Sequence, residues 1–471
     1  MTREIVGIPL IRLVALALSA ILVAAACVSI SLTPTDSPRS SRAPLASGTP
    51  TAPASPTPIG QPSTTPGSTT PATTPTTGPS GPATPGPTID PALAAQIDAV
   101  IAQVPAIRQL ESLADVPYEF ITRQQFRDDL IELQFEEVPE ETLRAEERLL
   151  KRLGLVPDDA DLLQQLVDLY GGQVAAYYRP DTKRFYIIQN DRPFGPADKI
   201  IVAHEYTHAL QDQHFDLEGT RIKDLSQGDG ILGQLGAIEG DATLTMQLWS
   251  IDNLSAEEQF QVLIDSIGQL EDPALANMPP VLRRQLEYPY VEGFSFIQGL
   301  YDVGGYDAVN ATLKDAIPAS TEQVLHPEKY LANEAPVHLA PPGAMVNLAN
   351  WRAVYEQTFG ELLMQVWAAG EETPPETIPG LPVEWPHAEV ASGWGGDALV
   401  MFEKADGSWA IVWRTAWDSA ADADEFRTRF AELASMFDGP SAITAGFDAD
   451  MVQVVIASDD DALRALNTLN L

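Results

Sequence analysis

The chain has 471 residues, of which 45% are hydrophobic, so it is long enough for two or three domains with a sizeable buried core. Its formal net charge is −38, and a surface of that sign excludes nucleic acid and anionic lipid as partners held by charge. Cys27 is the one cysteine, which excludes a disulfide within the chain.

The first 27 residues have the three parts of a secretory signal peptide. Arg3 and Arg12 precede an apolar run over residues 13–23, and small residues follow that run. The run is too short to predict a transmembrane span. The pattern therefore predicts an extracytoplasmic protein.

Cys27 directly follows the small residues and resembles the lipid-modified cysteine of bacterial lipoproteins. That resemblance implies a lipid anchor on the outer face of a bacterial cell membrane, the one membrane contact that we expect. Ala24 departs from the family, which usually has Leu there. Cleavage after Ala26 by an ordinary signal peptidase would give a secreted protein and explains the small residues equally well. Residues 28–88 are rich in Pro, Thr and Ser and predict a disordered linker.

The remaining chain predicts an α+β fold: a mostly helical domain over 89–374 with a small β-hairpin, then a small α+β unit over 375–471. In the first domain the sequence predicts helices over 90–113, 123–134, 139–154 and 158–170, a strand over 118–122 and a β-hairpin over 173–190. A further helix over 291–303 is expected to end at the glycines 304–305. In the C-terminal unit we expect a hairpin over 397–417, a helix over 418–437, a strand over 451–458 and a last helix over 459–469.

HEYTH, residues 204–208, carries the strongest chemical signal. The chain has only six histidines, and two of them lie in this pentapeptide, four residues apart. On a helix that begins after Gly195, His204 and His208 lie about 40° apart on one face, which suits two imidazole ligands of one zinc ion. The opposite face is apolar, so we expect one side to be buried and the other to face a cleft.

Glu205 is angled towards a water on that metal rather than towards the metal itself, which predicts the role of general base. The pattern resembles the zincin metallopeptidases, which implies one zinc ion per chain and a peptide or protein substrate. Two surface histidines on an ordinary amphipathic helix are the alternative interpretation.

The third ligand has two candidates. HEYTHALQDQH, residues 204–214, matches the metzincin spacing with His214 as third ligand, but Gln211 stands where that family has the Gly that turns the chain. If the helix continues, His214 lies about 15 Å along the axis from His204, too far to share one ion. Glu239, 31 residues after His208, instead resembles the downstream glutamate of the gluzincins, which implies a His204, His208 and Glu239 ligand set.

Three glycines flank Glu239 on its predicted helix, at positions 233, 236 and 240. Each costs about 1 kcal/mol relative to Ala in a helix, so a close backbone approach is the natural reason for them. We expect the HEYTH helix to be the close neighbour.

Other parts of the site are less defined by the sequence. Thr243 stands where gluzincins often have an Asp that orients a zinc-bound histidine, so Thr243, Asp212 and Asp241 are all candidates for that role. STEQVLHPEKY, residues 320–330, with the EGD of residues 239–241, resembles segments of secreted bacterial HExxH proteins. His326 and Tyr330 from that segment are candidates for stabilising an oxyanion.

Together these features predict a secreted, membrane-tethered zinc metallopeptidase of the gluzincin type. A zincin-fold binding module without turnover and a zinc hydrolase acting on another ester or amide are the alternatives.

Overall fold

The computed structural model describes residues 90–129, 139–165, 167, 174–189, 192–220, 222, 224, 226–270, 277–340, 350–374, 383–444 and 448–467. The expected signal peptide, Cys27 and the linker over 28–88 lie outside these ranges, as do residues 375–382, where the domain boundary is expected. Within the described ranges, none of the helices is both long and apolar enough to cross a membrane.

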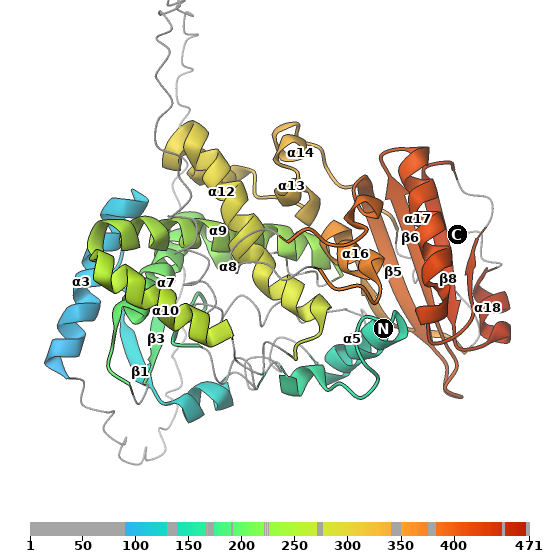
Figure 1. Ribbon diagram of the computed structural model, residues 1–471, viewed down its shortest axis with the longest axis horizontal. Helices are drawn as coiled ribbons and strands as arrows, with labels where there is room; N and C mark the ends of the chain where they lie inside the picture. Colours follow the sequence, from blue (N-terminus) through green and yellow to red (C-terminus); the bar gives the residue numbers. More distant parts are fainter. Residues whose placement is uncertain are drawn as a thin grey trace, which may run out of the picture. The chain divides into compact units, whose positions relative to one another are not determined.

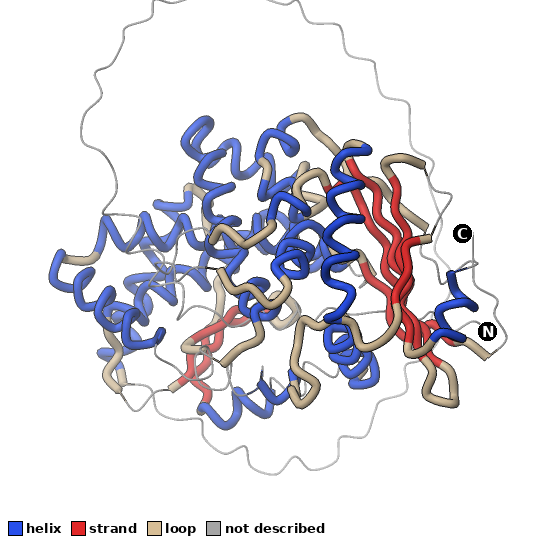
Figure 2. Tube along the Cα trace, turned by 45° about the vertical axis from the view of Figure 1, so that its right-hand side comes forward, coloured by secondary structure: helices blue, strands red, loops and turns tan. Residues whose placement is uncertain are grey.

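The fold is α+β, as the sequence predicts, with most helices ahead of a larger C-terminal sheet (Figures 1 and 2). The helices before that sheet are α3 (Pro91–Arg108), α5 (Glu140–Arg152), α7 (Pro196–Phe215), α8 (Leu217–Thr220), α9 (Gly228–Asn253), α10 (Ala256–Leu270), α12 (Pro280–Asp315), α13 (Thr321–Leu325) and α14 (Pro327–Leu331). Helix α9 packs against both α7 and α12, and the three helices form the framework that holds HEYTH.

A three-stranded sheet lies against α7. Its strands are β1 (Tyr118–Ile121), β2 (Ala176–Arg179) and β3 (Arg184–Ile188), in the order β1-β3-β2. The expected strand and β-hairpin are therefore confirmed. Strand β2 pairs antiparallel with β3 and stands at the edge of the sheet. On the face away from α7, the Tyr177 and Tyr186 rings stack with their centroids 5.0 Å apart.

The sequence had suggested that a helix ends at the glycines 304–305, and the helical backbone is indeed broken there, so that α12 consists of two helical segments joined at a kink. Gly305 adopts a positive φ of 62°, and helical structure resumes after this kink. Glycine takes that backbone conformation without steric cost, which explains the residue at this point.

The C-terminal sheet has five antiparallel strands in the order β4-β5-β6-β8-β7. Its elements are β4 (Arg352–Gln357), α16 (Gly360–Ala369), η2 (Ala388–Val390), β5 (Trp394–Glu403), β6 (Trp409–Trp417), α17 (Ala420–Glu432), η3 (Leu433–Met436), β7 (Ser441–Ile443), β8 (Met451–Ala457) and α18 (Asp460–Asn467). The expected hairpin, helix, strand and last helix are confirmed. Strand β4 precedes residue 374 in the chain and still belongs to this sheet.

The two faces of the larger sheet bury different helices. Trp413 of β6 packs edge-on against Trp367 of α16 and Phe426 of α17, with centroids 5.3 and 5.5 Å away. On the other face, a smaller apolar cluster joins Val412 and its neighbours to Leu466 of α18. Alternation of side chains along each strand produces these two cores.

Candidate metal centre

Helix α7 carries HEYTH through the interior of the protein. It begins with Pro196, and the Asp198 carboxylate accepts a hydrogen bond from the Gly195 N–H at 2.7 Å. All residues from 200 to 212 are buried, because α3, α9 and β2 surround the helix. The sequence had suggested one buried face and one face open to a cleft. In the structure the residues of both faces are buried, and His208, at 8% exposure, is the most exposed residue of HEYTH.

The structure brings His204, His208 and Glu239 together. The His204 Nε2 atom lies 3.1 Å from Glu239 Oε2 and 3.1 Å from His208 Nε2, and His208 Nε2 lies 3.4 Å from Glu239 Oε2. Helix α9 supplies the carboxylate and α7 supplies both imidazoles. Three ligand atoms that zinc prefers therefore converge on one point.

The spacing of these atoms fits a tetrahedral metal. Zinc bonds of about 2.0–2.1 Å at tetrahedral angles place neighbouring ligand atoms about 3.3 Å apart. The three separations, 3.1, 3.1 and 3.4 Å, match the edges of one tetrahedral face. A zinc ion held by these three atoms would have one further position for water, as catalytic zinc sites have.

Gln211 fixes the tautomer of His208. Its side-chain Nε2 donates to the Ile238 carbonyl at 2.9 Å and to Asp241 Oδ2 at 2.7 Å. The amide oxygen therefore faces His208, where Oε1 lies 2.9 Å from Nδ1. An amide oxygen only accepts, so Nδ1 carries the proton in the neutral ring and Nε2 presents its lone pair to the triad.

A buried ion pair supports Gln211 from behind. Asp241 is fully buried and pairs with Arg108, whose Nε lies 2.8 Å from Oδ1. Arg108 is the last residue of α3, and its guanidinium also donates to Asn310 and lies over the Tyr306 ring. Arg108, Asp241, Gln211 and His208 thus form a continuous chain of polar contacts, which ties the N-terminal helix to the metal centre.

The charges within the triad reinforce one another. Burial alone would raise the pKa of Glu239 and lower that of His208. Their mutual attraction outweighs burial, lowering the pKa of Glu239 to about 2 and raising that of His208 to about 9. Metal binding would therefore displace a proton from the imidazole.

Glu205 contacts strand β2 and also acts electrostatically on His208, whose pKa it raises. Its Oε2 accepts a hydrogen bond from the Tyr178 N–H at 3.0 Å. Two turns farther along α7, Asp212 accepts from the Tyr178 hydroxyl at 2.7 Å and from Lys183 at 2.6 Å. The edge strand and the HEYTH helix are therefore joined beside the proposed general base.

The glycines beside Glu239 do allow a close approach, but α7 is not the neighbour. A Cβ on Gly240 would lie 2.3 Å from the Gly293 carbonyl oxygen of α12, and one on Gly233 would lie 2.7 Å from the Ser320 carbonyl oxygen. The glycines let α12 and the start of α13 press against α9. The expectation that they face the HEYTH helix is corrected accordingly.

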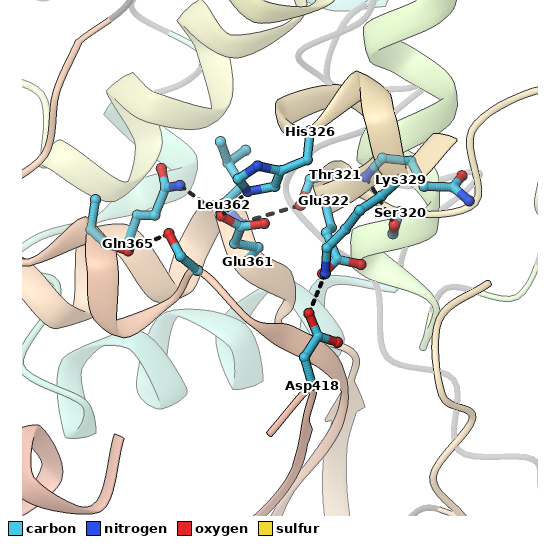
Figure 3. Close-up of polar contacts among 12 residues, drawn as sticks. Ser320, Thr321, Glu322, His326, Lys329, Glu361, Leu362, Gln365 and Asp418 are labelled. Carbon is cyan, nitrogen blue, oxygen red and sulfur yellow. Dashed lines mark hydrogen bonds and ion pairs between the residues drawn. The ribbon is translucent and has the colours of Figure 1, made fainter. Parts of the chain in front are cut away.

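The other candidates take separate places. His214 Nε2 contacts the Glu111 carbonyl oxygen at 2.8 Å, and His214 is not part of the metal triad. Thr243 is buried, with no hydrogen-bond partner among the described residues. His326 Nε2 lies 2.9 Å from Glu361 Oε1 (Figure 3), and the Tyr330 hydroxyl donates to Thr312 at 2.9 Å. Neither of these last contacts involves a member of the triad.

Two residues of the site were missed by sequence reasoning. Gln211 was noted only as a departure from the metzincin pattern, although its position three residues after His208 places it on the same helix face. Tyr290 of α12 was not singled out, and its ring centroid lies 6.2 Å from that of His204. Its only sequence signal is the aromatic pair at positions 288 and 290.

A family model described as a domain of unknown function (DUF8575) matches residues 348–467. That range contains the five-stranded sheet and ends with α18, so the metal triad lies outside it. Comparison with curated proteins and with solved structures gives no match.

Proposed function

We propose that the chain is a zinc-dependent metallopeptidase of the gluzincin type. His204, His208 and Glu239 would hold one zinc ion, and Glu205 would act as the general base. The observation that carries the proposal is the Gln211 contact, which sets the tautomer of His208. With that tautomer, the Nε2 lone pair of His208 is directed to the point where the three ligand atoms meet at tetrahedral spacing.

Bound zinc supplies a Lewis acid, which lowers the pKa of water towards about 7 and polarises a carbonyl group. Glu205 accepts a proton from the attacking water and passes it to the departing amine nitrogen. The new C–O bond forms at the peptide carbonyl carbon as the C–N bond breaks. The Tyr178 N–H donates to Glu205 Oε2 and so helps to hold the carboxylate in place.

Strand β2 offers a place for an extended peptide. The Ile188 N–H bonds to the Ala175 carbonyl at 2.8 Å, so Ala175 faces β3. Alternation then turns the N–H and C=O groups of Ala176 and the C=O group of Tyr178 to the outer edge, where the Tyr178 N–H already donates to Glu205. Among the described strands only β3 pairs with β2, and edge pairing beside Glu205 would align a substrate backbone with the site.

The proposed setting follows the signal peptide and linker: an extracytoplasmic enzyme, either anchored by lipid on Cys27 or secreted. Its substrate would be a peptide or a protein outside the cytoplasm.

A cleavage assay with matched zinc measurements tests the proposal. The protein is incubated with a diverse peptide library, and new peptide termini are detected by mass spectrometry. We expect cleavage that chelation abolishes and zinc restores, and a loss of about 10²–10⁴-fold in rate for Glu205→Gln with one zinc still bound. Glu218→Gln, which alters a glutamate outside the triad just after α7, serves as the matched control. Full activity in zinc-loaded Glu205→Gln contradicts the mechanism, and peptide binding without cleavage would favour a binding module.

A further inference from the structure

Arg108 lies where α3 meets α9 and α12. It is the last residue of α3, and its side chain is fully buried. Helix α3 packs against both α7 and α9, the two helices that carry the metal triad. Taking a guanidinium out of water is costly unless its hydrogen bonds and its charge are compensated, so a fully buried arginine needs a specific set of partners.

Three partners from two other helices hold the guanidinium. Its Nε donates to Asp241 Oδ2 of α9 at 2.9 Å, and its Nη2 donates to Asn310 Oδ1 of α12 at 2.8 Å. The face of the group lies 4.4 Å from the centroid of the Tyr306 ring. Tyr306 directly follows the kink at Gly305, and Asn310 comes four residues later on the same helix face. A planar group that is held at two edges and on one face has a fixed orientation.

The fixed guanidinium determines where the Asp241 carboxylate points. Asp241 Oδ2 accepts from Arg108 Nε at 2.9 Å and from Gln211 Nε2 at 2.7 Å. Gln211 turns its amide nitrogen towards that oxygen, which leaves its amide oxygen 2.9 Å from His208 Nδ1. If the carboxylate were free to rotate, the amide could turn over and present its NH₂ group to Nδ1. His208 would then favour the tautomer with a proton on Nε2, the atom that has to bind the metal.

We propose that Arg108 is a positioning residue of the metal centre, which raises zinc affinity by fixing Asp241 and, through it, the Gln211 amide. Helix α3 is then a necessary part of the zinc site, although none of its residues belongs to the metal triad. The inference rests on the zinc binding that the proposed function requires, and not on peptide cleavage. Partners that orient a metal-bound histidine change metal affinity by about 10–100-fold. Arg108 acts through two intermediate residues, so we expect an effect at the lower end of that range.

The test measures the zinc affinity of the full chain by competition with a chelator of known affinity, and it requires no substrate. Arg108→Met removes the guanidinium, and Arg108→Lys keeps the charge. The matched control is Gln103→Leu, which removes another contact between α3 and α9, the hydrogen bond from Trp249 Nε1 to Gln103 Oε1 at 3.0 Å. Thermal melting of each metal-free variant separates a loss of stability from a loss of zinc affinity.

A double-mutant cycle shows whether Arg108 acts through Gln211. We expect Arg108→Met to weaken zinc binding about 10-fold in the parent, but less than about 2-fold in Gln211→Leu, where the amide is already absent. Arg108→Lys should recover part of the affinity, because an ammonium group still pairs with Asp241. Gln103→Leu should bind zinc as tightly as the parent. Unchanged zinc affinity in Arg108→Met, or an equal loss in both backgrounds, overturns the inference.

A second variant covers the case in which Arg108→Met does not fold. Asn310→Ala removes the contact with Arg108 Nη2 and leaves the ion pair with Asp241 in place. We expect its zinc affinity to fall by less than about 10-fold, and that loss should also disappear in the Gln211→Leu background. Unaltered zinc affinity in Asn310→Ala overturns the inference.

Cleavage assays on the same variants separate this inference from the proposed function. Zinc affinity that depends on Arg108 supports the inference even if no peptide is cleaved, and the peptidase assignment alone then fails. Peptide cleavage together with a zinc affinity that does not depend on Arg108 overturns the inference alone. A parent chain that binds no zinc overturns both.

Discussion

Among the residues that the structure describes, two groups of side chains bring three potential metal ligands within 4.8 Å of one another, and they differ in what fills the space between them. The first is the metal triad of His204, His208 and Glu239. The second, here called the lysine cage, consists of Glu322, Glu334 and Asp418. In the lysine cage, Lys329 Nζ lies 2.5 Å from both Glu322 and Asp418 (Figure 3). The same atom lies 3.0 Å from Glu334.

The comparison shows that proximity of ligands does not by itself make a metal site. The lysine cage already contains a cation, the ammonium group of Lys329. Burial alone would lower the pKa of Lys329, but hydrogen bonds with Asp418 and Glu322 raise it, so the group keeps its charge. Its ligands are all carboxylates, and two of them are exposed. The metal triad has imidazoles, a fixed tautomer and full burial, and its ligand atoms contact one another rather than a lysine.

Glu239→Ala tests the first half of this comparison and has the largest expected effect. Removing the one carboxylate leaves two imidazoles, and we expect the variant to lose its zinc and any hydrolytic activity that depends on it. Native mass spectrometry counts zinc per chain. Glu334→Ala, which removes a carboxylate from the lysine cage, should keep one zinc; equal zinc loss in both variants would remove the distinction between the two groups.

Lys329→Met tests the other side of the comparison, the claim that the ammonium group of Lys329 holds the lysine cage together. Without the ammonium, three carboxylates repel one another around an apolar chain, and we expect the free energy of unfolding to fall by about 2 kcal/mol. Millimolar Ca²⁺ should partly restore the melting temperature of this variant by replacing the lost cation, while leaving the parent unchanged. An unaltered melting temperature in Lys329→Met would show that the ammonium does not stabilise the cage.

Gln211→Leu sharpens the account of the metal triad. Loss of the Nδ1 contact frees the tautomer and orientation of His208, so zinc should bind about 10–100-fold more weakly. Competition with a chelator of known affinity measures this change. Gln213→Leu, on the same helix but partly exposed, is the matched control. Unchanged zinc affinity in Gln211→Leu would mean that the contact does not orient the ligand.

Asp229, close to the lysine cage at the start of α9, gives a prediction about the pH dependence of stability. Burial raises its pKa to about 8, and the charge of Asp397 adds to the shift, against the Thr321 hydrogen bond. The folded state therefore holds a proton that the unfolded state releases near pH 3.9, so the free energy of unfolding falls as pH rises from about 4 to 8.

Asp229 lowers the free energy of unfolding by at most about 1.4 kcal/mol for each unit by which the pH rises. Denaturant titrations of the parent and of Asp229→Asn at several pH values measure it. We expect the variant to show a flatter profile in that range, and identical profiles would contradict the assignment to Asp229.

The local parts of the site could be predicted from the sequence. The spacing of His204 and His208 is a property of one helix, and Gly195-Pro196 marks where that helix begins. The β-hairpin before it followed from its turn residues and alternating pattern. Glu239 came from a resemblance to the gluzincins, and the structure places its carboxylate 3.1 Å from His204.

Parts that depend on tertiary packing could not be predicted. Asp241 reaches Gln211 only because α7 and α9 lie side by side, so the orienting role of Gln211 was invisible in the sequence. The glycines beside Glu239 indicated a close approach without identifying the neighbour. The apolar back face of α7 suggested an open opposite face, whereas β2 and α9 cover the polar side as well.

The most direct test of the central claim is crystallography of the zinc-soaked protein with data collected at the zinc absorption edge. The account predicts one anomalous peak, about 2.0–2.2 Å from His204 Nε2, His208 Nε2 and a Glu239 carboxylate oxygen, and none within the lysine cage. A peak in the cage, or no peak between α7 and α9, would contradict it.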